Sequence, residues 1–218
     1  MSRIIVFGGH GRIALLLAPL LVGRGDEVTG VIRNPAHTSD VEEGGANALV
    51  ADVEGMDVEA LAEIIRGHDA VVWSAVAGGG SPERTYAVDR DAAQRSMDAA
   101  ERAGVRRYVM VSWLGSTADH GVPEGDSFFP YADAKWAADE HLRRSGLEGT
   151  ILAPGTLTFD DPTSRIQIDP TGRGAVSRAD VAAVIAASLH EPCTIGRTIR
   201  FGNGDADSAV SIADALAC

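Results

Sequence analysis

A tyrosine and a lysine stand four residues apart at Tyr131 and Lys135, in a stretch with the pattern of a helix. Residues at this spacing share one helix face, so we expect the lysine ammonium to lie near the phenol. A nearby positive charge would lower the pKa of Tyr131 toward the working pH, so that the phenol can exchange a proton with a carbonyl or alcohol. Ser112 ends the preceding apolar run and can hydrogen-bond the same substrate oxygen. An exposed amphipathic pair is the alternative.

A glycine-rich turn, Gly8-Gly9-His10-Gly11, follows the first apolar run and opens the first helical stretch. Gly8 permits a tight turn, and Gly11 lets the backbone approach a diphosphate, while Ala14 is small enough for close packing of the helix on the strand. The free N–H groups at the helix start would bind that anion. The place of the turn between strand and helix favours a dinucleotide site over a plain glycine turn. His10 either lines the phosphate or is solvated.

A basic residue stands where dinucleotide-binding proteins that use NAD have an acid. The second apolar run ends in Arg33-Asn34. A guanidinium suits a 2′-phosphate through its charge and forked hydrogen bonding, so we expect NADP to bind in preference to NAD, with Arg12 as a second contact. Asp52, after the third run, either accepts from the adenine amino group or caps a turn. A surface role for Arg33 is the alternative.

Apolar runs alternate with helical stretches along the whole chain, as in parallel strands joined by right-handed crossovers. Because the runs are continuously apolar, they indicate a sheet covered on both faces. The predicted strands are 4–7, 28–32, 48–51, 70–73, 108–111 and 150–152. The predicted helices are 12–24, 58–66, 87–103, 132–145, 178–190 and 212–216, with left-handed caps at Gly67, Gly104 and Gly146. We therefore predict an α/β fold with a Rossmann-type doubly wound parallel sheet in a single domain.

The composition is that of an acidic, folded chain with enough residues for one core. Its 218 residues include 19 Lys and Arg against 31 Asp and Glu, so the formal net charge is −12, and 45% of the residues are hydrophobic. A negative field repels nucleic acid and anionic lipid, so we expect a small-molecule substrate, no nucleic-acid or membrane partner, and a monomer or homodimer. The scattered histidines and cysteines have no zinc-ligand spacing, so no metal is expected.

Two cysteines, Cys193 and Cys218, bear on the compartment. Without the spacing of a disulfide framework they suit a reducing cytoplasm, although the two could form a bridge. The apolar run 14–22 is too short to span a membrane and follows a strand-like segment and a glycine turn, which argues against a signal peptide. We therefore expect a cytoplasmic protein.

Taken together, these motifs resemble the short-chain dehydrogenase/reductase superfamily. The chain is most similar to its small atypical NAD(P)-binding branch, which includes NmrA-like and biliverdin reductase B-like proteins. The resemblance spans nearly the whole chain and rests on the glycine turn, Arg33, Asp52, Ser74-Ala75, the run 108–112, Tyr131 with Lys135, Pro154-Gly155 and the run 177–181. Two positions depart from it. Ala153 stands where relatives often have arginine, and Ala14 replaces the third glycine.

The resemblance implies that Ser112, Tyr131 and Lys135 are the catalytic positions. It also implies that residues 74–76 pass beside the cofactor and that residues 154–157 border the nicotinamide, with the substrate over that ring. The cleft for the substrate is expected in the C-terminal part, about residues 113–180. The full predicted cofactor set is Gly8, Gly9, His10, Gly11, Arg12, Ile13, Arg33, Asn34, Asp52, Val53, Ser74, Ala75, Val76, Tyr131, Lys135, Pro154, Gly155, Thr156 and Leu157.

Two functions of different classes fit these residues. The first is an NADP-dependent reductase or dehydrogenase acting on a small carbonyl, flavin or similar substrate. The second is a dinucleotide-binding redox sensor of the NmrA-like kind, without turnover. Tyr131 with Lys135 favours the enzyme, because a sensor needs no proton relay. An isomerase or epimerase on the same scaffold is a third, less favoured hypothesis.

Overall fold

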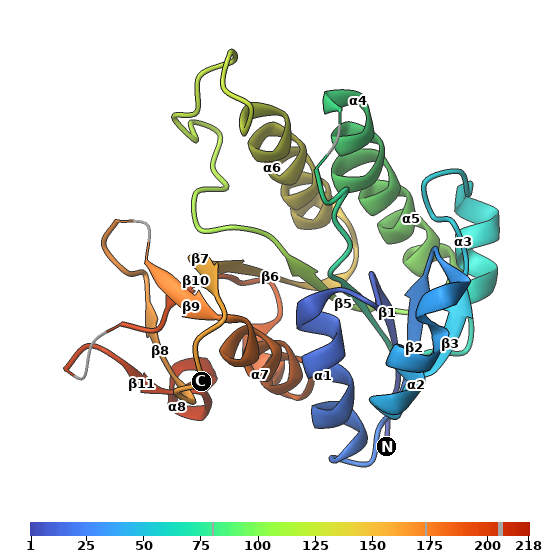
Figure 1. Cartoon of the computed structure of the whole chain (residues 1–218), viewed down its shortest axis with the longest axis horizontal. Coiled ribbons are helices and arrows are strands. Elements are labelled where there is room, and N and C mark those ends of the chain that lie inside the picture. Colours follow the sequence, from blue (N-terminus) through green and yellow to red (C-terminus); the bar gives the residue numbers. More distant parts are fainter. Residues whose placement is uncertain (80, 173, 205–206) are drawn as a thin grey trace.

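The computed structural model describes residues 1–79, 81–172, 174–204 and 207–218, and Figure 1 shows a central sheet with helices on both faces. The sheet has nine strands in the order β11-β8-β10-β6-β5-β4-β1-β2-β3. They are β1 (Arg3–Phe7), β2 (Glu27–Ile32), β3 (Asn47–Val50), β4 (Ala70–Trp73), β5 (Arg107–Val111), β6 (Glu148–Pro154), β8 (Arg165–Ile168), β10 (Thr198–Gly202) and β11 (Val210–Ser211). A separate parallel pair consists of β7 (Thr156–Thr158) and β9 (Ala175–Ser177).

The helices follow the strands in alternation, as the sequence pattern predicts. They are α1 (Arg12–Val22), α2 (Thr38–Glu43), α3 (Val58–Ile65), α4 (Pro82–Thr85), α5 (Ala93–Ala103), α6 (Phe129–Arg144), α7 (Arg178–His190) and α8 (Ile212–Leu216). Short 3-10 turns, η1 (Pro35–His37) and η3 (Pro192–Thr194), lie before α2 and after α7, and a π-helical segment, η2 (Tyr86–Ala92), joins α4 to α5.

Alternate residues of the first strand show how the two layers are built. Ile4 and Val6 pack into the core beneath α1 and α7, whereas Ile5 and Phe7 pack into the core beneath α3, α5 and α6. A strand with both faces covered must be apolar throughout, which explains the uninterrupted run 4–7. The prediction of a doubly wound sheet is therefore confirmed.

The point where the chain reverses direction across the sheet lies between β1 and β4. Strand β1 pairs in parallel with β2 on one side and with β4 on the other. The connections that leave the carboxyl ends of β1 and β4 run in opposite directions across the sheet, which leaves a crevice between them. Open α/β sheets bind ligands in such a crevice. The glycine turn after β1 lies at this position, as the sequence indicates.

Several details differ from the sequence predictions. Strand β8 runs antiparallel to β10 and β11 runs antiparallel to β8, so the sheet is not wholly parallel. The helix expected from residue 87 begins at Pro82 and contains the π-helical turn η2. Gly67 and Gly104 have φ of 85° and 75° as expected, but Gly146 has no positive φ and its N–H donates to Glu101 Oε1. The short β8 and β11 strands have no strong local pattern.

The two cysteines form a disulfide between Cys193, in η3, and Cys218. The structure therefore has the bridged alternative, and the cysteines no longer support the expectation of a reducing compartment. Glu191 lies beside both sulfurs, within a distance that could hold an ion, but the disulfide uses both thiols. Within the described ranges, no helix is both long enough and apolar enough to cross a bilayer.

The close approach of the glycine turn to β2 predicts a stability effect. A Cβ at Gly9 would lie 2.7 Å from Gly30 Cα, so Gly9→Ala should lower the free energy of unfolding by about 1–3 kcal/mol, the usual cost of overpacking. Urea denaturation followed by circular dichroism measures this change. Gly55→Ala is the matched control, because a Cβ at Gly55 would have no neighbouring atom within 4 Å. Equal stability of the two variants would contradict the packing argument.

Candidate functional site

The turn after β1 is held against two neighbouring strands by backbone packing. Gly8 has a φ of +82°, and a Cβ there would meet Ala75 Cα at 2.7 Å. Only glycine combines that conformation with that proximity. The Gly11 N–H donates to the Gly8 carbonyl oxygen at 2.7 Å, and Gly11 precedes the first residue of α1. The N–H groups at the start of α1 therefore face the carboxyl edge of the sheet, where they can bind an anion.

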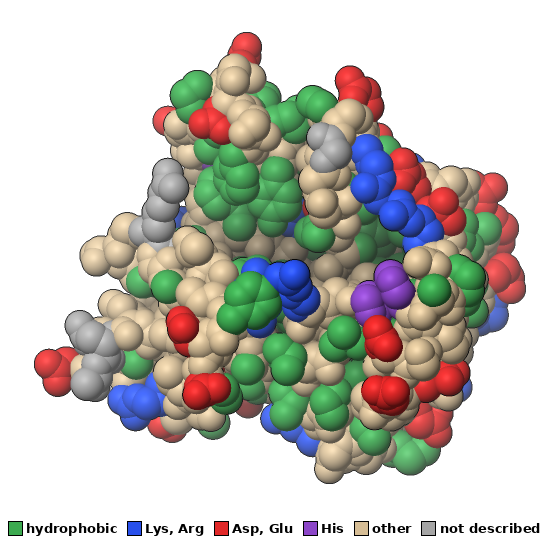
Figure 2. Space-filling view, viewed as in Figure 1, with side chains coloured by type: hydrophobic (Ala, Val, Ile, Leu, Met, Phe, Trp, Pro, Cys, Tyr) green, Lys and Arg blue, Asp and Glu red, His purple; other side chains and the backbone are tan. Residues whose placement is uncertain are grey.

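A cavity of about 440 Å³ opens beside this turn, at the carboxyl ends of β1, β2, β3 and β4. Its volume is in the range of small-molecule sites. In Figure 2 this face of the molecule is hollowed across the middle, and cationic and histidine side chains lie along the hollow. Predicted residues that line the cavity are Gly8, His10, Gly11, Arg33, Asn34, Asp52, Val53, Ser74, Ala75 and Val76. The structure therefore brings together ten residues of the predicted cofactor set from four separate loops.

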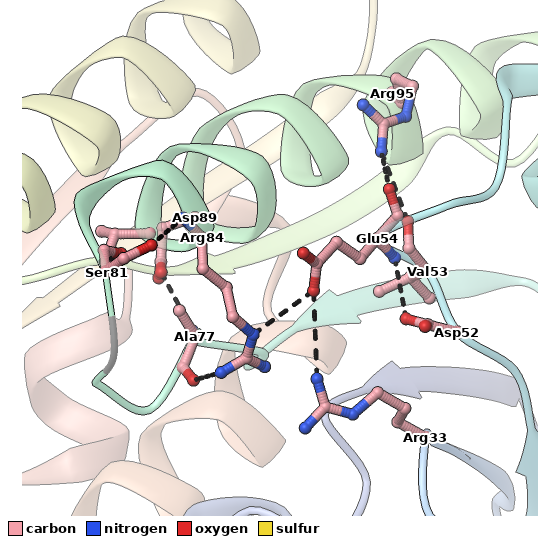
Figure 3. Close-up of polar contacts among 10 residues, drawn as sticks. Arg33, Asp52, Val53, Glu54, Ala77, Ser81, Arg84, Asp89 and Arg95 are labelled. Carbon is pink, nitrogen blue, oxygen red and sulfur yellow. Dashed lines mark hydrogen bonds and ion pairs between the residues drawn. The ribbon is translucent and has the colours of Figure 1, made fainter.

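Two arginines share one carboxylate at the wall of this cavity. Glu54 Oε2 lies 3.4 Å from Arg84 Nε and 3.9 Å from Arg33 Nη1. Arg84 also donates to the Ala77 carbonyl oxygen at 2.6 Å, which fixes its guanidinium at the cavity (Figure 3). The two cations and one anion leave a net positive charge at the place where the sequence predicts a 2′-phosphate. Neither Glu54 nor Arg84 was predicted, although Glu54 directly follows the predicted Asp52 and Val53, and Arg84 lies in α4.

The loop after β3 is held in place by hydrogen bonds from Arg95, which lies on α5. Its guanidinium donates to the carbonyl oxygens of Met56, Val53 and Glu54 at 2.9, 3.4 and 3.0 Å (Figure 3). Asp52 Oδ1 accepts from the Glu54 N–H at 3.3 Å and so caps this turn, while its contact with the adenine amino group stays a prediction. These contacts hold Glu54 in place without using its carboxylate.

Other predicted residues at the cavity have local partners. Asn34 Oδ1 accepts from the Ala36 N–H and caps η1. His10 stacks on His37 with ring centroids 3.7 Å apart, and its Nε2 lies 2.7 Å from Asp40 Oδ2. His10 and His37 both line the cavity, and a contact of His10 with the phosphate stays a prediction. The side chain is thus oriented before any ligand binds.

The predicted catalytic residue Lys135 belongs to a buried charged cluster, together with Asp89 and Asp139. Lys135 is fully buried on α6, and its Nζ is 3.9 Å from Met110 Sδ, a weak acceptor. Within the described residues no carboxylate comes within ion-pair distance of this ammonium. Its charge is balanced at longer range by the buried carboxylates of Asp89 and Asp139. A buried ammonium with so weak a partner fits a ligand hydroxyl such as that of a ribose.

Both carboxylates of the cluster have defined contacts and one unused oxygen. Asp139 Oδ2 accepts from Ser112 Oγ at 2.5 Å and from Ser116 Oγ at 2.6 Å. Asp89 Oδ2 accepts from the Ala77 N–H at 3.0 Å, which connects the cluster to the cavity wall. In the part of the chain that the structure describes, Oδ1 of each aspartate is buried without a hydrogen bond. The π-helical turn η2 places Asp89 inward, and such turns are frequent at functional sites.

The pKa of Tyr131 moves opposite to the sequence prediction. Burial raises it, and the negative charges of Asp89 and Asp139 raise it further. Lys135 does not offset them, so the prediction of a lowered tyrosine pKa is wrong. The hydroxyl makes no hydrogen bond to any described residue, while its ring packs against Phe128 with centroids 5.1 Å apart. Tyr131 is therefore a neutral phenol, and its hydroxyl is available to a ligand.

Burial also shifts the pKa values of the charged residues around Tyr131. It raises the pKa of Asp139, against the opposing charge of Lys135 and the serine hydrogen bonds. It raises the pKa of Asp89 in the same way. Burial lowers the pKa of Lys135, against the two carboxylates. Perturbed groups of this kind cluster at functional sites, although structural networks perturb pKa values too.

The remaining predicted positions lie outside the cavity lining. Residues 154–157 run from the end of β6 into β7, where the Gly155 N–H donates to the Phe201 carbonyl oxygen at 2.8 Å. Arg12 and Ile13 begin α1, and the Ile13 side chain is buried in the core. The residues that sequence reasoning missed are Glu54, Arg84, Asp89, Ser116 and Asp139. Asp139 had one usable signal, since it lies one helical turn after Lys135.

Comparisons with known proteins agree with this geometry. A family model described as NAD(P)H-binding matches residues 8–192. Bacillus subtilis YhfK, named an uncharacterized sugar epimerase, is 33% identical over 217 residues that cover 98% of each chain. A Bacillus halodurans structure named for NAD-dependent epimerases and dehydratases has a TM-score of 0.90 at 30% identity, with 99% of each chain covered. The Lactococcus lactis oxidoreductase ylbE has a TM-score of 0.86 at 28% identity, covering 98% of this chain and 94% of that chain.

The matched range includes the glycine turn, the cavity and the buried cluster, so the similarity covers the parts that could do chemistry. The predicted resemblance to the atypical branch of the short-chain dehydrogenases/reductases is confirmed. This chain belongs to the NAD(P)H-binding family, with the Rossmann-type fold that its sequence indicates.

Proposed function

We propose that this protein is an NADP-dependent oxidoreductase that reduces a small carbonyl, flavin or similar substrate. One observation supports this most directly. A dinucleotide cavity and a buried lysine are connected through a single carboxylate, because Asp89 contacts the cavity wall at Ala77 and also balances the charge of Lys135. Tyr131 with Lys135 on α6 favours an enzyme over a protein that only binds the dinucleotide, because a sensor needs no proton relay.

Each residue has a role in this proposal. The backbone at Gly8 and Gly11 holds the diphosphate, and the Lys135 ammonium binds a ribose hydroxyl. NADPH, when bound, supplies a hydride to the substrate carbon. The Tyr131 hydroxyl, neutral because its pKa is raised, donates a proton to the substrate oxygen. Residues 154–157 border the nicotinamide, with the substrate over that ring, and the cleft is formed by about residues 113–180.

Ser112 acts differently from a simple donor to the substrate. Its one hydroxyl proton is directed to Asp139 Oδ2, so its lone pairs are left to accept a hydrogen bond. Ser112 can then accept from the Tyr131 hydroxyl or from the alcohol product. Asp139 keeps this orientation because it is buried and also accepts from Ser116. The serine therefore orients the proton donor rather than polarising the carbonyl.

The preference for NADP rests on the charges at the cavity wall. Arg33 and Arg84 supply two guanidiniums for a 2′-phosphate, and both lie within ion-pair distance of Glu54. Glu54 also favours the opposite outcome, because a carboxylate can accept from the ribose hydroxyls of NAD. The two arginines outnumber it, and we therefore favour NADP.

Variants of Arg33 and Glu54 separate the two cofactors. Arg33→Ala should weaken NADP binding by about 1–3 kcal/mol, because a charged hydrogen bond is lost, and should leave NAD binding nearly unchanged. Glu54→Gln should strengthen NADP binding, because it removes a repulsive charge. Isothermal titration with both dinucleotides measures these effects. Tighter binding of NAD by the wild type, or weaker NAD binding in Glu54→Gln, would show that the acid recognises a ribose.

Removing the phenol tests the proton donor. Tyr131→Phe keeps the ring and its packing on Phe128, so cofactor binding should be retained while turnover falls by about 10²–10⁴-fold. Ser112→Ala should act mainly on turnover. A screen of carbonyls, quinones and flavins that follows NADPH absorbance supplies the substrate for these assays. Full activity of the phenylalanine variant would mean that solvent donates the proton and that Tyr131 is structural.

The raised pKa of Tyr131 predicts opposite pH profiles for the two directions. The phenol stays protonated through neutral and mildly alkaline pH, so reduction should not be limited by its ionisation there. Oxidation needs the phenolate, whose fraction grows about tenfold per pH unit below the pKa, so oxidation should rise steadily with pH. Initial rates in both directions across about pH 6–10 measure this. A plateau of the oxidation rate near neutral pH would indicate a lowered pKa instead.

A second candidate is suggested by the relatives. The names of the B. subtilis and B. halodurans proteins point to epimerases, which abstract and return a hydrogen with a bound dinucleotide. The same tyrosine would serve that reaction, so substrate screening should include hydroxylated sugars without added NADPH. A redox sensor would bind the dinucleotide and show no turnover in either screen.

A cytoplasmic location and a monomer or homodimer remain part of the proposal.

A further inference from the structure

Two arginines meet at one exposed aromatic ring, outside the dinucleotide cavity. The guanidinium carbon of Arg12 lies 4.7 Å from the centroid of Phe159, and that of Arg178 lies 4.1 Å from the same centroid. Arg12 is the first residue of α1 and Arg178 the first residue of α7, two helices that lie side by side in Figure 1. The Phe159 ring is 73% exposed. Residues distant in sequence thus place two cations together at the surface.

These cations have no acidic partner among the residues that the structure describes. Arg178 donates to the carbonyl oxygens of Leu157 and Thr158 at 3.2 and 2.9 Å, and Arg12 forms no ion pair there. Asp160 and Asp161 follow Phe159 in the chain but pair with neither guanidinium in the described part. The nearby Asp180 is used by Thr163, Ser177 and Asn203. In a chain of net charge −12, two adjacent unpaired guanidiniums are unusual.

The electrostatics of the pair favour an added anion. Burial lowers the pKa of Arg178, and the positive charge of Arg12 lowers it further. Like charges this close repel each other, and an anion between them removes that repulsion. A guanidinium also presents a fork of donors that matches the two oxygens of a carboxylate or phosphate. The Arg178 hydrogen bonds to the β7 segment fix its position before a ligand binds.

The position of the pair distinguishes it from the cofactor's phosphate contacts. The cavity at β1–β4 is lined by Gly8, His10 and Gly11, but by none of Arg12, Phe159 or Arg178. Leu157, whose carbonyl oxygen accepts from Arg178, belongs to the segment that we propose to border the nicotinamide, where the substrate would lie over the ring. The pair therefore lies outside the cavity lining and beside Leu157 and Thr158, near the place where we propose the substrate to bind.

We propose that Arg12 and Arg178 form an anion-binding site that binds a carboxylate or phosphate of the substrate while the dinucleotide is also bound. The proposal rests on the proposed function only in assigning this side to the substrate. It narrows the substrates to compounds with an acidic group. The alternative source of the same chemistry is the diphosphate of the dinucleotide, and the experiment separates the two.

Arginine modification by phenylglyoxal, mapped by peptide mass spectrometry, tests the site in the wild-type protein. Three samples are compared: free protein, protein saturated with NADP, and the NADP-saturated protein with citrate or inorganic phosphate added. Arg178 should react readily in the first two samples. In the third, an anion at about ten times its dissociation constant should slow the modification of Arg12 and Arg178 about tenfold.

Two internal controls make the result interpretable. Arg143 lies over the Trp136 ring at 5.1 Å in a similar way but is paired with Glu140, so added anions should not protect it. Arg33 reports on the cofactor, because NADP should protect it. If NADP fails to protect Arg33 but anions protect Arg178, the proposed cofactor preference fails and the anion site stands.

The outcomes that would overturn the proposal are specific. Protection of both arginines by NADP alone would assign them to the dinucleotide diphosphate. No protection by citrate or phosphate in the NADP complex would show that the pair binds no anion. The variant Arg178→Gln adds a check on cooperation between the two guanidiniums. It should abolish the protection of Arg12 by anions, whereas unchanged protection of Arg12 would refute a shared site.

Discussion

The close approach of one turn to its two neighbouring strands is the constraint on which the site depends. The backbone at Gly8 and Gly9 lies against Ala75 on one side and Gly30 on the other, so that a methyl group at either position would collide with main-chain atoms. This contact fixes where β1 ends relative to β2 and β4. It also places the start of α1 at the crevice between β1 and β4. The cavity, its arginines and the buried cluster all take their positions from that crevice.

Charge balance is the second organising feature. The protein has a strongly negative net charge, yet its candidate site concentrates cations: Arg33 and Arg84 at the cavity, Lys135 beneath it, and Arg12 with Arg178 beyond the glycine turn. At the cavity Arg33 and Arg84 share the carboxylate of Glu54, whereas Arg12 and Arg178, at Phe159, have no acidic partner among the described residues.

The buried cluster shows how a familiar residue pair acquires different properties from its surroundings. A tyrosine and a lysine on one helix face would lower the tyrosine pKa if they interacted alone. Here burial raises the tyrosine pKa instead, and the negative charges of Asp89, from η2, and Asp139, further along the same helix, raise it more. The tyrosine is therefore protonated at neutral pH, as a proton donor must be before the reaction.

The sequence by itself determined the fold class, most strand positions and the glycine turn, because each depends on residues adjacent in the chain. Continuous apolar runs mark buried parallel strands, and the turn's glycines are needed wherever the backbone passes close to another strand. It also indicated ten of the residues that line the cavity. The short antiparallel strands β8 and β11 and the π-helical turn η2 were not predictable in this way, since their local patterns are weak and their pairing is tertiary. Only the tertiary structure decided which charges meet. Glu54 meets Arg33 from another loop and Arg84 from α4, Asp89 approaches Lys135 from η2, and Arg12 meets Arg178 from a distant part of the sequence. The physical reason is that a pKa or an ion pair depends on distance and burial in space, and the spacing of residues along the chain carries that information only within a helix or a strand.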